Sequence, residues 1–189
     1  MLHNSSSASW LLVCTSMLLL TSCKDEKETP AATTNNGDFM TWTQNGQVYK
    51  ATDVSAFTYK SIPIISINGG VVLPGQGLSE RTLTISVPNS LTKPGTYSLP
   101  QSSTPADVVS GQLVLVVPGI STPVDYNTVY GPAAVNGTVT LTEYDVQAQR
   151  LVGTFEFTAE SSGSASPLTQ TVTAGSFRLT KLEAAPGGL

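Results

Sequence analysis

Apolar and polar residues alternate in steps of two along most of the chain after residue 38. This period is typical of β-strands that bury one face and expose the other. The longest apolar stripe takes alternate positions of one segment: Leu151, Gly153, Phe155, Phe157 and Ala159. Residues 113–117 are continuously apolar, which predicts a central strand covered on both faces. No stretch of ten residues in this part has a helical period, so the pattern predicts about eight to ten short strands.

Pairs of residues with turn-forming chemistry separate these runs. Asn-Gly readily takes positive φ, and Pro-Gly suits type II turns. The pairs are Asn45-Gly46, Asn68-Gly69, Pro74-Gly75, Pro94-Gly95, Pro118-Gly119, Gly131-Pro132 and Asn136-Gly137. Short strands and turns at this spacing predict an all-β fold, with one antiparallel β-sandwich or barrel-like domain over residues 39–183 and a tail at 184–189.

One strand pairing follows from the apolar stripes themselves. Residues 137–145 and 150–160 are expected to form a hairpin with its loop near 146–150. Both stripes are buried on one face only if the numbers of paired residues add to an even sum. We therefore expect Leu141 opposite Phe155, with the two side chains on the same face of the sheet.

The N-terminus has the pattern of an export signal. Residues 10–20 form an apolar core that is well short of the ~20 residues needed to cross a bilayer. The following Leu20-Thr21-Ser22-Cys23 resembles the lipobox of bacterial lipoproteins. The resemblance implies removal of residues 1–22 and lipidation of Cys23. The first nine residues depart from it, because they contain no Lys or Arg, and a plain secretory peptide or a buried apolar helix are the alternatives.

The residues after Cys23 have the composition of a spacer. The run from Lys24 to Glu28, a Lys followed by acidic residues, resembles the surface-export signal of Bacteroidota lipoproteins. It implies an outer-membrane protein that faces outward, with a periplasm-facing location as the alternative. Residues 24–38 contain one Pro and no aliphatic side chain larger than Ala, which predicts a flexible tether. Such a tether has an end-to-end distance of about 20 Å.

Short motifs in the predicted domain also resemble a known group. In chain order they are residues 47–51, 95–97, 137–142, 153–157 and 175–177, which read QVYKA, GTY, GTVTLT, GTFEF and GSF. This pattern is similar to a Bacteroidota lipoprotein family of unknown function, whose members have a lipobox, a short linker and a β-rich domain. The resemblance implies an all-β fold and carries over no catalytic residue.

Composition excludes several kinds of site. The net charge is −4 and 12% of residues are charged, which gives no basic stripe for a phosphate backbone, so we expect no nucleic-acid partner. The single His and both Cys residues (His3, Cys14 and Cys23) lie in the first 23 residues. The predicted domain therefore lacks the side chains for Ser-His-Asp, Cys-His or Cys/His zinc sites and for disulfides. We expect no cofactor and no metal, because Asp125 with Asn127 supplies too few oxygens for calcium.

Paired carboxylates remain as candidate catalytic groups. Glycoside hydrolysis needs two of them roughly 5–9.5 Å apart. Glu156 and Glu160 share a strand face but are about 13 Å apart along it. Glu143 and Asp145 are about 6.6 Å apart on an extended strand, which is within range. Arg150 lies near enough in the predicted hairpin to pair with them, so a solvated hairpin end with weak ion pairs is the simpler interpretation.

Binding is better supported than catalysis. Tyr and Trp offer an apolar face with a polar group, which suits contacts to sugars or proteins. Residues 119–132 form the longest predicted loop, and Asp125, Tyr126 and Tyr130 on it are our candidate ligand-binding residues. Trp42 and Tyr49 flank the Asn45-Gly46 pair and are instead expected to pack in a hairpin or the core.

The sequence thus predicts a lipid-anchored surface lipoprotein of the outer membrane, held to the membrane through Cys23. Its domain is expected to be a non-enzymatic binding or assembly module, with a glycan or a surface protein as its partner. Two alternatives stay open. One is a surface carbohydrate-active hydrolase that uses Glu143 and Asp145, and the other is an exposed edge strand that docks with a partner sheet.

Overall fold

The structure is a computed structural model of the chain. It describes residues 37–59, 62–72, 79–91, 93–102, 108–116, 122–145, 147–162 and 167–185. Cys23, the predicted signal peptide and all but the last two residues of the predicted tether lie outside the described residues. The described residues belong to one unit, Asn35–Leu189.

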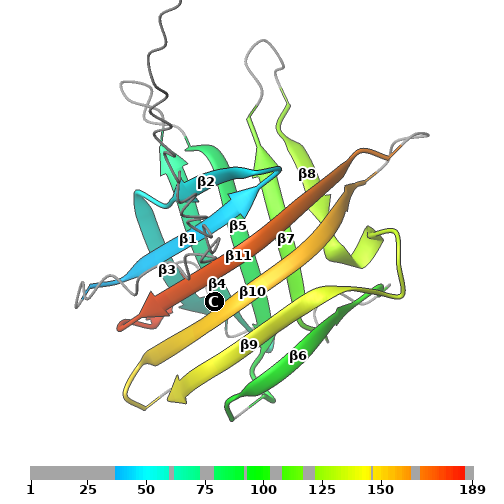
Figure 1. Ribbon diagram of the computed structural model, residues 1–189. Coiled ribbons are helices and arrows are strands. Elements are labelled where there is room, and N and C mark those ends of the chain that lie inside the picture. Colours follow the sequence, from blue (N-terminus) through cyan, green and yellow to red (C-terminus); the bar gives the residue numbers. More distant parts are fainter. Residues whose placement is uncertain are drawn as a thin grey trace, which may run out of the picture. The chain divides into compact units, whose positions relative to one another are not determined.

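Twelve strands form one mostly antiparallel sheet that folds back on itself into two layers (Figure 1). The front layer has the order β2 (Gln47–Lys50), β1 (Phe39–Gln44), β11 (Thr169–Leu179), β10 (Arg150–Ser161), β9 (Val135–Asp145) and β6 (Gly95–Pro100). The back layer has the order β12 (Glu183–Ala184), β3 (Asp53–Thr58), β4 (Ile64–Val72), β5 (Ser79–Pro88), β7 (Ser110–Leu115) and β8 (Val124–Asn127). The predicted all-β fold is confirmed.

Helical structure is nearly absent from the described residues. They contain one 3₁₀ turn, η2 (Thr128–Tyr130), and no α-helix. Accordingly, no helix in the described ranges has the length and apolar character needed to cross a membrane.

The core between the layers is built from the inward residues of the predicted stripes. Leu151, Phe155, Phe157 and Ala159 on β10 are all buried. Gly153 belongs to the same stripe of β10 and lies directly opposite Phe177 on β11. Gly175 on β11 lies opposite Phe155 in the same way. A glycine opposite each ring leaves room for the phenyl group to lie across the neighbouring strand.

The β1–β2 hairpin confirms the first predicted turn. Asn45 and Gly46 have φ of 48° and 84°, and Gln44 pairs with Gln47, which is a two-residue turn of type I′. The rings of Trp42 and Tyr49 stack across this hairpin with centroids 5.8 Å apart. The predicted packing role of these two aromatic residues is therefore confirmed.

Two other predicted turns are wrong, because both pairs lie inside strands. Asn68-Gly69 is in β4, where the side chain of Asn68 accepts a hydrogen bond from Thr84 Oγ1 on β5 at 2.8 Å. Asn136-Gly137 is in β9, where Asn136 is buried and hydrogen-bonded to backbone groups. Asn68 is thus held by a neighbouring strand, and the second pair is held in β9 by Gly137, which pairs with Phe157 on β10. The Pro74-Gly75 and Pro118-Gly119 pairs lie outside the described residues.

The β9–β10 hairpin forms as predicted but with a different register. Leu141 and Phe155 are both buried on the same face, yet Leu141 pairs with Gly153 and Val139 pairs with Phe155. The expected pairs are thus wrong by two residues. One of the two residues is already lost at the loop, because Arg150 pairs with Asp145, and the other is lost at a β-bulge beside Thr142, which adds one residue to β9.

The apolar run at residues 113–117 is not a strand covered on both faces. It contributes to β7, which lies between β5 and β8. Leu113 is buried there, whereas Val114 and Leu115 are half-buried, and Val117 lies outside the described residues. One side of the back layer therefore covers the core while the other is partly open to solvent.

Both ends of the domain are fastened to strands. Asp38 Oδ1 accepts hydrogen bonds of 2.7 Å from the backbone N and the Oγ1 of Thr180. At the other end, β12 pairs with β3 in parallel, and the backbone N of Ala185 donates to Thr58 O. Asp38, which the sequence placed in the tether, and residues 184–185, which it placed in the tail, are thus held by the folded domain.

Candidate functional site

The structure separates the three residues predicted to bind a ligand. The expected long loop is wrong, because β8 occupies Val124–Asn127 and η2 follows it. Tyr126 faces the core and is 4% exposed. Asp125 points to the opposite side of the strand and accepts a 3.0 Å hydrogen bond from Gln112 Nε2. Tyr130 in η2 is 50% exposed. A binding role for these residues stays a prediction. The buried ring of Tyr126 is not exposed for a ligand to contact.

The predicted carboxylate pair lies at an exposed hairpin end. Glu143 makes an ion pair of 2.8 Å with Arg150. Asp145 Oδ1 accepts a 2.8 Å hydrogen bond from the backbone N of Ala148 and thereby caps the hairpin loop. Each carboxylate thus has a local structural partner, and neither lines the pocket found in the described residues.

Tyr144 lies between these two carboxylates in the chain. Burial, and in second place the nearby Tyr97, raises the pKa of the Tyr144 phenol above 10.0. The phenol therefore stays protonated at neutral pH and does not act as a general base beside Glu143 and Asp145.

A different place in the fold has the geometry of a binding site. β8 and β9 both pair with the same edge of β10, because Asn127 lies opposite Glu160 and Gly137 lies opposite Phe157. β8 and β9 therefore follow one another along the same edge of β10, and between them the chain leaves that edge and returns to it as an excursion. We call this excursion, residues 128–136, the crossing segment. It marks the corner at which the sheet passes from the back layer to the front layer.

Hydrogen bonds hold the crossing segment in a fixed shape. Asn136 is buried, and its Nδ2 donates to Thr128 O at 2.8 Å and to Ala133 O at 2.7 Å. Its Oδ1 accepts from the backbone N of Ala133 at 2.9 Å. Thr128 Oγ1 accepts from the backbone N of Gly111 on β7 at 3.0 Å. The segment is therefore tied both to itself and to the back layer.

Gly137 allows β9 to rejoin the edge of β10. Its φ is 144°, a conformation that side-chain-bearing residues rarely adopt. A Cβ atom at this position would lie 2.1 Å from the backbone oxygen of Glu156. The close approach of the two chains at this point therefore requires a glycine.

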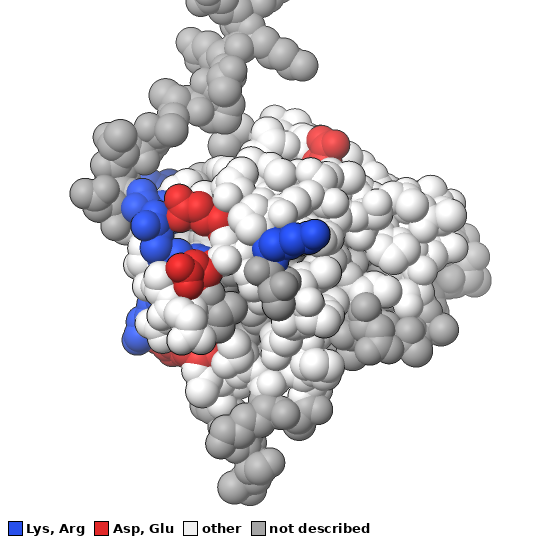
Figure 2. All heavy atoms as spheres, turned by 90° about the horizontal axis from the view of Figure 1, so that it is seen from below, with Lys and Arg blue, Asp and Glu red and all other residues white. Residues whose placement is uncertain are grey.

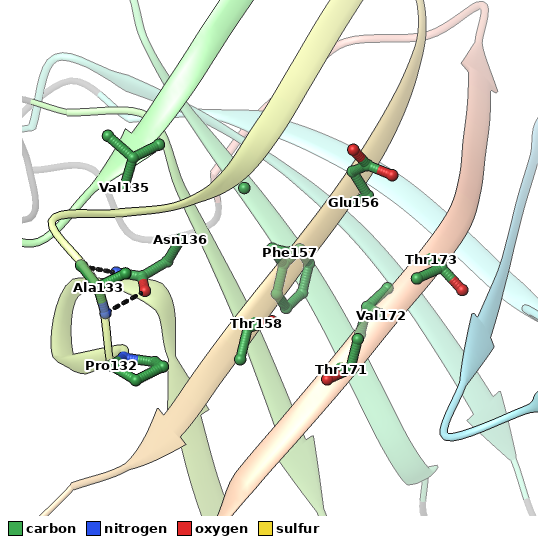
Figure 3. Close-up of a pocket in the computed structure, with 11 residues that line it drawn as sticks. Pro132, Ala133, Val135, Asn136, Glu156, Phe157, Thr158, Thr171, Val172 and Thr173 are labelled. Atoms are coloured by element: carbon green, nitrogen blue, oxygen red, sulfur yellow. Dashed lines mark hydrogen bonds between the residues drawn. The ribbon is translucent and has the colours of Figure 1, made fainter.

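A pocket of about 290 Å³ lies between the crossing segment and the outer face of β10 and β11 (Figure 3). One wall comes from the crossing segment, through Pro132, Ala133 and Val135. The other wall consists of outward residues of β10 and β11: Glu156, Thr158, Thr171 and Thr173. Figure 3 shows Asn136 turned toward Ala133, so that its amide stabilises the wall. The pocket therefore combines an apolar side, three hydroxyls and one carboxylate.

Charge is sparse around this pocket. Among the described residues that line it, Glu156 alone is ionisable. Figure 2 shows one face of the molecule, on which acidic and basic side chains gather toward one side and leave a broad uncharged area. Within the described ranges, no group of three or more His, Cys, Asp or Glu is placed to hold a metal ion.

The sequence contained part of the signal for this site. The alternation in β10 and β11 puts Glu156, Thr158 and Thr171 on the outer face. Nothing in the chain indicated that β8 and β9 share one edge of β10, and that shared edge creates the second wall. The pair Asn136-Gly137 was interpreted as a turn, although its asparagine is the centre of the hydrogen bonds in the crossing segment.

A comparison with known protein families shows which family the domain belongs to. Residues 35–179 match a domain of unknown function, DUF6252. The chain belongs to this family. The DUF6252 match includes β1 to β11 and every residue of the pocket, whereas Cys23 and β12 lie outside it. No curated protein and no solved structure matches the chain.

Proposed function

We propose that this protein is a lipid-anchored, surface-displayed binding module that captures a saccharide in the pocket beside the crossing segment and performs no catalysis. The observation that carries the proposal is the pocket itself. Its volume of about 290 Å³ lies at the lower end of the range for small-ligand sites, which begins at about 300 Å³. Its crossing-segment wall is fixed by the buried Asn136 amide, so little conformational entropy is lost when a ligand binds.

The anchor part of the proposal is supported by the N-terminal sequence. The apolar core at residues 10–20 is followed directly by Thr21-Ser22-Cys23. Each buried methylene contributes about 0.8 kcal/mol, and two or three acyl chains on one residue hold a protein permanently on a membrane. A tether of about 20 Å then keeps the pocket close to the envelope surface and its glycans.

The hydrolase alternative has less support from the geometry. It requires Glu143 and Asp145 to converge on one substrate. Glu143 is engaged by Arg150, and Asp145 is engaged by the hairpin loop. A hydrolase would need both interactions to break when substrate binds, and we therefore favour binding without catalysis.

An assembly role has one specific observation in its favour. No described strand pairs with the outer edge of β6. β6 contains no charged residue, whereas the edge strands β2 and β12 contain Lys50 and Glu183. Edge strands without charge are suited to pair with another chain. Docking of a partner strand on β6 is thus our second candidate function.

A glycan array with two matched variants tests the pocket. Thr171→Trp places a large ring in the pocket from an exposed strand position, whereas Thr96→Trp places the same ring on exposed β6 outside it. We expect the unmodified domain and the Thr96→Trp variant to retain the same glycans, and Thr171→Trp to lose them. Equal retention by all three proteins, or by none, contradicts the proposal.

A further inference from the structure

We infer that the pocket selects a sugar with a free amino group, and that Glu156 supplies the opposite charge. This inference rests on the proposed function, because it names the ligand class of the same pocket.

The first step is the charge of the site. Glu156 is exposed and takes part in none of the ion pairs among the described residues. Arg150 is engaged by Glu143. Arg178 lies opposite Val152, four positions along β10 from Glu156, or about 13 Å away. The carboxylate is therefore available to an incoming cation.

The second step is the hydroxyl groups around that carboxylate. Thr158 and Thr171 are direct cross-strand partners, so their side chains lie on the same face. Thr173 follows on that face of β11. Each hydroxyl can both donate and accept a hydrogen bond. Such a row fits the ring hydroxyls of a sugar, which also donate and accept.

The third step is the apolar wall. Pro132 and Val135 are exposed residues of the crossing segment that line the pocket, and Figure 3 shows the Pro132 ring on the side of Thr158. A pyranose ring has C–H groups on its faces and hydroxyls at its edge. A sugar can therefore place its C–H groups against the Pro132 ring and its polar edge against the threonines.

The discrimination follows from the strength of the contact with Glu156. A neutral hydroxyl and an ammonium can both donate a hydrogen bond to the carboxylate, but only the ammonium adds the Coulomb attraction of a positive charge. An N-acetylated sugar has no such charge, and a simple hexose has a neutral hydroxyl at that position. Because Glu156 is exposed, we expect a glucosamine disaccharide to bind about two- to fivefold more tightly than a glucose disaccharide with the same linkage.

The test is a calorimetric titration of the domain with three β-1,4-linked disaccharides: those of glucosamine, N-acetylglucosamine and glucose. We expect the glucosamine disaccharide to bind most tightly and to weaken as salt is added. Glu156→Gln should reduce its affinity to that of the glucose disaccharide. Asp53→Asn, a change at an exposed carboxylate of β3 outside the pocket, should leave all three affinities unchanged.

The outcomes separate this inference from the proposed function. Equal binding of the three disaccharides, abolished by Thr171→Trp, overturns the amine preference and keeps the pocket. Binding that neither Glu156→Gln nor Thr171→Trp weakens overturns both, and so does an absence of binding by every disaccharide. If an N-acetyl-lysinamide binds through Glu156 while no disaccharide binds, the sugar class is wrong.

Discussion

At the scale of single residues, the front layer depends on glycines that face phenyl rings. Gly153 pairs with Phe177, and Gly175 pairs with Phe155. A Cβ on Gly153 would lie 2.5 Å from the backbone oxygen of Thr140 and 2.8 Å from Cζ of Phe177. The backbone atom cannot move aside without disturbing the β9–β10 pairing. These glycines therefore set the spacing on which the core of the front layer depends.

This spacing predicts a large effect for a one-carbon change. We expect Gly153→Ala to lower the free energy of unfolding by about 1–3 kcal/mol, the range found when a packed core is overfilled. Urea denaturation followed by tryptophan fluorescence measures the change. Gly37→Ala is the matched control, because a Cβ there meets nothing within 4 Å. A loss at Gly153 no larger than the loss at Gly37 contradicts the packing account.

Asn136 is the residue on which the wall of the pocket depends. We expect Asn136→Ala to cost about 2–3 kcal/mol of unfolding free energy, because it removes three hydrogen bonds that join residue 136 to Thr128 and Ala133. Asn89→Ala, at an exposed position, should change it by less than about 0.5 kcal/mol. Hydrogen exchange of the Ala133 amide reports the same loss locally. Unchanged exchange in the variant is the result that this account does not allow.

At the scale of elements, local chemistry predicted the turn that closes a hairpin but not the glycines inside strands. Asn45-Gly46 needs only its own backbone preference to form a type I′ turn. Asn136-Gly137 has the same composition, yet contacts from distant segments hold it in β9. The β9–β10 register shows the same limit. The face of Leu141 followed from alternation, whereas its partner depended on the exact loop and on a bulge, neither of which alternation reveals.

The β1–β2 turn allows the conformational effect to be measured alone. Gly46 has φ of 84°, and a Cβ there has no neighbour within 4 Å. We therefore expect Gly46→Ala to cost about 1–2 kcal/mol through backbone strain without any clash. Gln47→Ala, at the next and exposed position, should be nearly neutral. Thermal unfolding of the two variants compares these effects, and equal melting temperatures contradict the assignment of strain to Gly46.

The predicted ligand site failed at the same scale of elements. Residues 124–127 alternate apolar and polar, which is a strand signal, but β8 is only four residues long, and so short a run between turn-forming residues also fits a loop. A strand at this place puts Tyr126 inside and Asp125 outside. The pocket itself arises where three strands meet, and no pattern within one strand indicates such a junction.

At the scale of the whole molecule, the proposed anchor makes a prediction that does not depend on the ligand. We expect the native protein to sediment with membranes and to have a mass that shows loss of residues 1–22 and addition of acyl chains at Cys23. Cys23→Ser should release the protein into the soluble fraction, whereas Cys14→Ser should leave it on the membrane. Fractionation with intact-mass analysis tests both variants. A native protein with an unmodified Cys23 contradicts the anchor.

The most direct test of the account is to map a bound disaccharide on the domain by amide chemical shifts. The disaccharides of glucosamine, N-acetylglucosamine and glucose are added separately to labelled protein. We predict that shifts concentrate at residues 131–137, 156–158 and 171–173, which surround the pocket. Shifts centred instead on β6, on the Glu143–Asp145 hairpin end, or on Asp125 and Tyr130 contradict the claim that this pocket is the binding site.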